Sequence, residues 1–190
     1  MSWTKLVRTA EPEVLPVTLS QLKHWLREDL EGQDSLIETL IQDAVDYIEG
    51  PDGIGVAMSP QTWEMHLDAF PHVIRIPLSP VMSVKSIKYT DESGEQQNLE
   101  GFQSDTVSKP ARLMPEHGKQ WPQTQSSLNA VVVEFNAGYD RVPGDLLRAV
   151  ALLVAHWYEH REAVVVGSIA TETPFAVESI LNKYRVGRFG

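Results

Sequence analysis

Residues 129–162, NAVVVEFNAGYDRVPGDLLRAVALLVAHWYEHRE, contain the change of hydrophobic period that decides the fold class. In the first part, Val131, Val133 and Phe135 occupy alternate positions, the period of a β-strand with one buried face. After Pro143, which suits the first turn of a helix, apolar residues recur every three or four positions to about the end of the stretch. We therefore predict a strand followed closely by a long helix.

Two further helices are predicted nearer the N-terminus. The segment TLSQLKHWLREDL, 18–30, begins with Thr18 as N-cap and has Gln21 three residues later. This spacing is a capping box, in which each side chain accepts a hydrogen bond from the other residue's backbone N–H. The second helix is expected from 34 to about 49, with a wide apolar face, and Gly50 is suited to end it.

Between about 56 and 137 the sequence consists of short alternating segments separated by turn residues. The predicted strands lie in TWEMHLDAF (62–70), HVIRIPL (72–78), VKSIKYT (84–90), the segment after a turn at 91–94, ARLMP (111–115) and NAVVVEFNAGY (129–139). Because no helical pattern separates them, we expect an antiparallel sheet or a small barrel. The segment 115–129 is predicted to be a long polar loop, a type that often contacts a partner.

A last short helix is expected to begin at Thr173–Pro174. Its apolar side would consist of Phe175, Val177, Ile180, Leu181 and Tyr184. Residues 1–17 show no periodicity, and we interpret them as an extended arm that is ordered only if something holds it. Taken together, these elements predict an α+β fold, with a small bundle of four helices carrying a β-rich insertion at about 56–137.

The composition excludes several kinds of site. The chain has 190 residues, 42% of them apolar, which is enough for one domain with a sizeable core. It contains no cysteine, so disulfides, thiolate metal sites and cysteine nucleophiles are excluded. No run of about 18 apolar residues is present, and the N-terminus lacks the apolar region of a secretory signal. We therefore expect a protein that stays in solution where it is made.

The charge balance is acidic. The chain has 26 Asp and Glu against 16 Lys and Arg, a formal net charge of −10. Proteins that bind nucleic acid normally carry a basic surplus, because neutralising phosphates supplies most of the affinity. We therefore expect no direct binding of DNA, although a surface that repels DNA suits the lining of a channel through which DNA slides.

The sequence HWYEH places three candidate metal ligands within five residues, at His156, Glu159 and His160. This H-x-x-E-H pattern occurs in inverted zinc peptidases. At about 100° per residue, His160 lies at the edge of the apolar face of the helix, His156 lies further round and Glu159 lies on the solvent side. A catalytic zinc also needs a third protein ligand and groups that orient the ligands, and no pattern supplies them. We predict no catalytic or metal site, and keep a small metal-dependent hydrolase as the alternative.

The order of several segments resembles the head-to-tail connector, or adaptor, family of long-tailed bacteriophages and gene transfer agents. The segments, in order, are two N-terminal helices, QTWEMHLDAFP, IRIPLSPVMSVKSIKY, AVVVEFNAGY, VPGDLLRAVALLVAHWYEHREAVV and ILNKYRVGRF. No single motif is diagnostic, and the resemblance rests on order and spacing from about Thr18 to Phe189. In that family the HWYEHRE segment lies on a helix of the subunit core or interface and is not catalytic.

The resemblance implies a structural virion protein without cofactors or enzymatic activity. It would be made in the cytoplasm of a host bacterium and would assemble into a ring of about twelve copies at the head–tail junction. One side of the ring would dock on the portal protein, and the other would receive the next connector, stopper or tail component. DNA would pass through the lumen without specific binding.

The implied organisation is a connector domain at 18–181, between the arm at 1–17 and a docking tail at 182–190. Aromatic and arginine side chains make strong anchors at interfaces. We therefore expect the portal-docking residues to be Tyr184, Arg185, Arg188 and Phe189. Trp121 and Pro122, in the long loop, are a further possible contact with a neighbouring subunit or the tail. A protein that assists DNA packaging remains a third hypothesis, and it would bind terminase or DNA.

Overall fold

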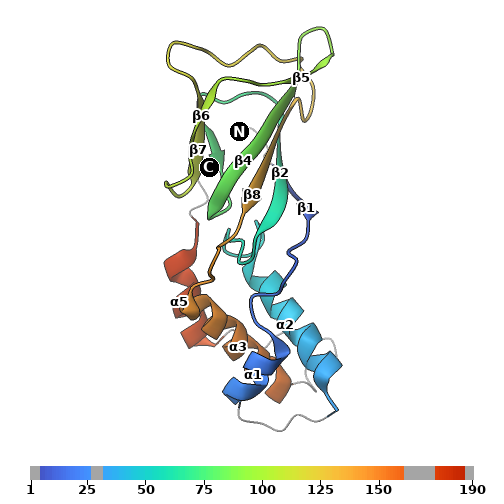
Figure 1. Ribbon diagram of the computed structural model, residues 1–190, viewed down its shortest axis with the longest axis vertical. Coiled ribbons are helices and arrows are strands. Elements are labelled where there is room, and N and C mark those ends of the chain that lie inside the picture. The colour runs from blue at the N-terminus through green and yellow to red at the C-terminus, as the bar shows by residue number, and fades with distance from the viewer. Residues whose placement is uncertain (1–4, 27–31, 161–173, 187–190) are drawn as a thin grey trace.

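The structure, a computed structural model, describes residues 5–26, 32–160 and 174–186. The molecule is elongated, with a helical half at one end and a β-rich half at the other (Figure 1). Long stretches of chain cross between the halves where the helical half meets β2 and β8. The predicted α+β class is confirmed, and the helices belong to one bundle below two antiparallel sheets.

The helical half contains α1 (Leu19–Leu26), α2 (Asp34–Ile48), α3 (Gly144–Glu159) and α5 (Phe175–Tyr184). The predicted capping box is present: the Thr18 N–H donates to Gln21 Oε1 at 3.0 Å, and the Gln21 N–H donates to Thr18 Oγ1 at 3.2 Å. α2 has the predicted extent, and Gly50 follows it with a positive φ of 75°. The buried core of this half is formed mainly by Leu22, Ile37, Ile41, Ala44, Ile48, Leu146, Val150, Leu153, Val154, Val177 and Leu181.

The larger sheet has the strand order β1-β2-β8-β4-β5, and every neighbouring pair is antiparallel. Its strands are β1 (Lys5–Ala10), β2 (Gln61–Leu67), β8 (Val131–Ala137), β4 (Val81–Thr90) and β5 (Gln96–Asn98). A smaller sheet, β3-β7-β6, is formed by β3 (Ile74–Ile76), β7 (Ala111–Pro115) and β6 (Phe102–Asp105).

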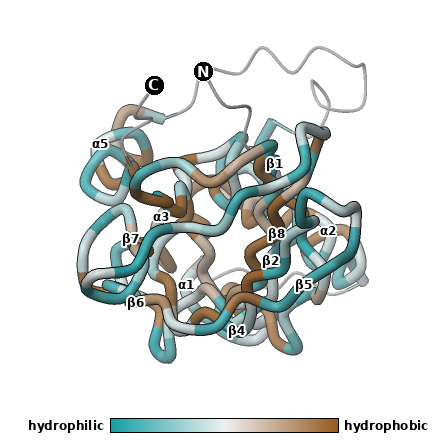
Figure 2. The backbone as a smooth tube through the Cα atoms, turned by 90° about the horizontal axis from the view of Figure 1, so that it is seen from above, coloured by the Kyte–Doolittle hydropathy of each residue, from teal (hydrophilic) through white to brown (hydrophobic). Residues whose placement is uncertain are grey.

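The alternation read from the sequence correctly identifies the buried face of the central strands. Trp63, Met65 and Leu67 of β2 are buried, as are Val131 and the alternate residues after it in β8. In the view from above, the hydrophobic stretches of β2 and β8 lie toward the middle of the molecule, and the outer strand β5 is hydrophilic (Figure 2). Both sheets therefore enclose a second core, separate from that of the helices.

Five details differ from the sequence-based prediction. Part of the arm, β1, is a strand held along the edge of β2, and β6 was not predicted. Pro143 is the N-cap of α3 and not its first helical residue, and α3 ends at Glu159 and not near 162. Phe175, predicted on the apolar side of the last helix, is 85% exposed, because it is the first residue of α5 and lies beyond the core contacts made by Val177.

The two halves are joined by chain segments that lie against each other. The Tyr139 N–H, at the start of the β8–α3 connection, donates to Met58 O at 2.9 Å, in the α2–β2 connection. Gly138 has φ 132°, and a Cβ at this position would lie 2.3 Å from Ser59 O. Only glycine allows so close an approach of two backbones, so the halves are tightly connected at this point.

Candidate functional site

The HWYEH segment lies at the C-terminal end of α3 and does not assemble a metal site in the described structure. The rings of His156 and His160 are 4.6 Å apart, and His160 Nδ1 donates to His156 O at 2.8 Å. Glu159 is exposed, as expected, whereas His160 is also exposed and is not at the edge of the core. Within the described ranges, no three His, Cys, Asp or Glu side chains are grouped so that they could hold a metal ion. His156 Nε2 is buried and has no hydrogen-bond partner there.

The predicted docking residues are divided between the fold and residues outside the described part of the chain. Tyr184 ends α5 and is partly buried against the helical core, and Arg185 is the C-cap. Val186 is buried, and its N–H donates to Ile54 O at 2.9 Å. Arg188 and Phe189 lie outside the described residues. The tail therefore joins the fold as far as residue 186.

The long polar loop has an internal anchor. The Trp121 ring stacks on the Phe70 ring with their centroids 4.9 Å apart, and Trp121 Nε1 donates to His72 O at 3.3 Å. Trp121 and Pro122 are both half-buried. Trp121 thus holds the loop against the β-rich core, and part of its surface and of that of Pro122 stays exposed.

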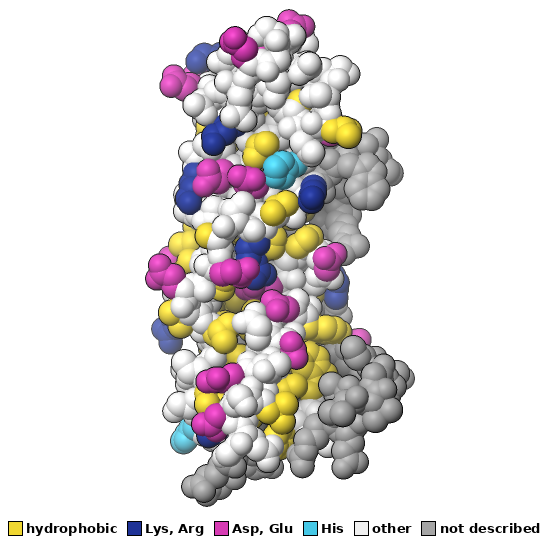
Figure 3. All heavy atoms as spheres, turned by 90° about the vertical axis from the view of Figure 1, so that its right-hand side faces the viewer, with side chains coloured by type: hydrophobic (Ala, Val, Ile, Leu, Met, Phe, Trp, Pro, Cys, Tyr) yellow, Lys and Arg dark blue, Asp and Glu magenta, His cyan; other side chains and the backbone are white. Residues whose placement is uncertain are grey.

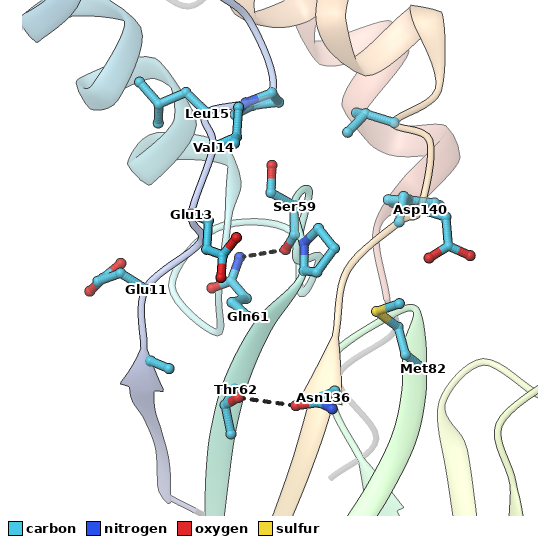
Figure 4. Close-up of a pocket in the computed structure, with 15 residues that line it drawn as sticks. Glu11, Glu13, Val14, Leu15, Ser59, Gln61, Thr62, Met82, Asn136 and Asp140 are labelled. Atoms are coloured by element: carbon cyan, nitrogen blue, oxygen red, sulfur yellow. Dashed lines mark hydrogen bonds between the residues drawn. The ribbon is translucent and has the colours of Figure 1, made fainter.

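A cleft of about 670 Å³ lies where the two halves meet (Figure 4). One wall is the segment after β1, with Glu11, Glu13 and Val14, and Asp140 lies on the opposite side. The lining contains three acids and no Lys or Arg, and 66% of Val14 is exposed. The lining contains no His, Cys or Lys, and it offers a mixture of apolar and acidic surface.

A buried carboxylate lies behind this cleft. Glu49, which follows α2, is 3% exposed and accepts hydrogen bonds from the Met58 N–H and, at 3.1 Å, from Gln61 Nε2. Arg8 Nη2, from β1, donates to Glu49 Oε2 at 3.4 Å, and the Arg8 guanidinium carbon lies 5.1 Å from the centre of the Trp63 ring. Burial raises the pKa of Glu49 above 4.5, and the hydrogen bonds and Arg8 oppose this rise.

The Glu49 cluster connects α2, β1 and β2, and the sequence-based reasoning missed it. The sequence shows Glu49 only as the last residue of a helix pattern, and Arg8 lies in an arm without periodicity. The available signal was weak: Glu49 directly follows the buried Ile48 and precedes the turn at Gly50. A residue between a buried helical residue and a turn can face the interior, and a buried charge needs a hydrogen-bonding or ionic partner.

The outward face of α2 is the most acidic helical surface in the described structure. Its exposed acids are Asp34, Glu38, Asp43 and Asp46, and α2 contains no Lys or Arg. In the space-filling view of this side, acidic side chains form a column over the helical half, next to an apolar area (Figure 3).

Among the described residues, no helix is long and apolar enough to cross a membrane.

Comparison with known proteins gives one family match and several structural matches. The family model described as head completion protein matches residues 17–186. No curated protein sequence is significantly similar to this chain. The resemblance expected from the sequence is thereby confirmed at the level of the family.

Three solved structures with similar chains are parts of gene transfer agent (GTA) particles. A chain in the neck of an empty GTA particle, computed with C6 symmetry, is 22% identical with TM-score 0.78, and the match covers 98% of this chain and 97% of that chain. A chain in the virion of a native GTA particle is 21% identical with TM-score 0.78, with 97% of both chains covered. A chain in the neck of a native GTA particle, computed with C12 symmetry, is 21% identical with TM-score 0.74, with 98% and 97% covered. At these identities the likeness shows that the fold is shared.

Proposed function

This chain belongs to the head completion protein family, and we propose that it is a structural protein of the neck that joins a DNA-filled head to its tail. The observation that carries this proposal is the family match over residues 17–186, supported by a fold shared with neck proteins along nearly the whole chain. The particle would be a tailed phage or a gene transfer agent. The protein would be made in the host bacterial cytoplasm and would function in the virion.

The proposed assembly is a ring of about twelve copies around the path of the DNA. The cyclic symmetry of the similar neck structures supports a ring. The net charge of −10 supports a lumen that repels DNA and so lets it slide, because like charges do not form lasting contacts.

The proposed partners above and below the ring are the portal protein and the next connector, stopper or tail component. Arg185, at the end of α5, starts a segment that continues in the sequence with the basic Arg188 and the aromatic Phe189. We assign portal docking mainly to these three residues, because the Tyr184 side chain is partly buried against the subunit core. The exposed sides of Trp121 and Pro122 are assigned to a contact with a neighbouring subunit or the tail.

We propose no catalytic role. The metal-dependent hydrolase needs His156, Glu159 and His160 to act together, and Glu159 is exposed while the rings of the two histidines lie against each other. A helix end with this arrangement is better explained as the solvent-facing boundary of the bundle.

Removal of the gene from the producing cell tests the proposed function. We expect DNA-filled heads and separate tails, counted by electron microscopy, and we expect joining to return when the intact chain is supplied in trans. Complementation with the His156→Ala variant, which lacks the candidate ligand, is the matched control and should also restore joining. Normal tailed particles in the absence of the chain would refute the proposal, and failure of His156→Ala in a folded chain would favour the hydrolase.

A further inference from the structure

The helical half carries two different surfaces on opposite sides. One is the outward face of α2, with its exposed acids Asp43 and Asp46. The other is an apolar groove of about 460 Å³, with α1 contributing Trp25 to one side. The rest of the groove is formed by α3 residues Gly144, Leu147, Arg148, Ala151, Leu152 and Ala155.

Helical geometry places these surfaces back to back. α3 packs against α2 through the face that includes Val150 and Leu153. At about 100° per residue, the side chains of α3 that line the groove and those that form the buried face point in two mean directions around the helix axis. These two directions differ by about 160°. The groove therefore opens on the side of α3 that points away from α2, while on α2 the exposed Asp46 lies opposite the buried face.

The charges of the two surfaces are complementary. Arg148 is exposed and is the only charged residue in the groove lining. Its guanidinium forms no ion pair with any acid in the described part of the chain, whereas Lys183, nearby on α5, is already paired with Asp145 at 3.3 Å. The α2 face offers several carboxylates and no cation of its own. Trp25 is 45% exposed, and Ala151 and Ala155 are small enough to let a neighbouring helix approach closely.

We propose that the groove between α1 and α3 receives the outward face of α2 from a second copy of this chain, so that Arg148 meets Asp43 and Asp46 of the neighbour. This proposal rests on the ring of the proposed function. A closed ring is built by a head-to-tail contact, in which one patch meets a different patch on the next copy, and the two patches must lie on roughly opposite sides of the subunit. The two surfaces meet both conditions, and their opposite charges would fix the direction of assembly.

The absence of cysteine allows a direct test by thiol cross-linking in assembled particles. The double variant Thr39→Cys with Ala155→Cys places one thiol on the α2 face and one in the groove. A short thiol-specific cross-linker should then produce a ladder of covalent oligomers, because each copy is joined to the next. The matched control is Ser93→Cys with Ala155→Cys, in which the first thiol lies in the exposed turn between β4 and β5 and should give no ladder.

The outcomes separate this inference from the proposed function. A ladder from the first pair alone supports the proposed contact. If particles contain the double variant but no ladder forms, or if Ala155→Cys becomes linked to a different neck protein, the inference is overturned while the structural role stands. If the chain is absent from the particles, the proposed function fails, and the inference fails with it.

Charge reversal gives a second test that needs no cross-linker. Arg148→Glu should lower the number of joined particles about tenfold, because it places like charges across the contact. Adding Asp43→Arg to the same chain should restore most of the loss. Lys109→Glu, at an exposed position of the β-rich half, is the control and should have no effect. Equal losses in the single and double reversals, with both chains folded by circular dichroism, would contradict the pairing.

Discussion

At the scale of single residues, Glu49 is the side chain whose chemistry has the largest structural consequence. It supplies the acceptor for the Met58 N–H and the counter-charge for Arg8, and it connects the helical half to two strands. Burying a carboxylate is costly unless it is hydrogen-bonded and paired, and both conditions are met here. The cluster therefore links β1 and β2 to the end of α2.

We predict that Glu49→Ala lowers the free energy of unfolding by about 3 kcal/mol, because it leaves a buried N–H and the Arg8 charge without their partner. Urea denaturation of the purified chain measures this. The control is Glu11→Ala, which removes the exposed partner of Arg8 and should change stability by less than about 1 kcal/mol. Equal effects of the two variants would show that the buried pair has no special role.

The raised pKa of Glu49 also predicts a pH dependence. The folded state holds this proton more tightly than the unfolded chain, so the folded protein binds more protons between pH 4.5 and the raised pKa. The free energy of unfolding should therefore fall as pH rises through this window, and level off above it. Glu49→Gln should lack this component, whereas Asp91, whose pKa is lowered to about 2, affects stability only at lower pH. Parallel stability profiles for the natural chain and Glu49→Gln would contradict this assignment.

At the scale of elements, hydrophobic period and capping residues predict most of the fold. The α2 helix and strands β2 and β8 follow from strong patterns, because each buries one whole face. β1 and β6 could not be found this way. β1 lies at the sheet edge with no fully buried residue, and β6 has none either, so neither has an alternating pattern to read. Backbone pairing with a neighbouring strand, and not side-chain burial, determines these two.

The candidate surfaces were predicted less completely than the fold. The tail segment was identified from its composition, and the helix pattern placed Tyr184 on the apolar side, but neither shows that Val186 is drawn into the core. The groove and the α2 face could not be predicted, because they depend on which sides of α1, α2 and α3 face each other. The helix patterns define the buried sides but not the arrangement of the exposed ones.

The last helix and the tail after it should have separable roles. Deleting 187–190 keeps Val186 and its hydrogen bond to Ile54, so the free energy of unfolding should change by less than about 0.5 kcal/mol. Head–tail joining should nevertheless be impaired, because Arg188 and Phe189 are removed. Deleting 183–190 also removes the end of α5 and a buried side chain, and should cost about 3 kcal/mol as well. Denaturation and particle counts measure the two effects, and full joining after the shorter deletion would remove the tail from the docking surface.

At the scale of the whole molecule, shape and charge together explain how this chain could serve in a neck through its surfaces alone. The elongated subunit has closely packed halves, and its helical half carries an acidic face and an apolar groove. Repeating such a subunit around an axis buries both surfaces between copies and leaves an assembly with a strong negative charge. The function then depends on symmetry and fit, and a single subunit would have little activity of its own.

The most direct measurement is native mass spectrometry of the neck complex released from purified particles. We predict many identical copies of this chain per neck, about twelve, with no bound metal. The result that would contradict the proposed ring is a neck containing one or two copies. A chain recovered apart from the neck, as a monomer carrying one zinc ion, would contradict the structural role altogether and favour the hydrolase.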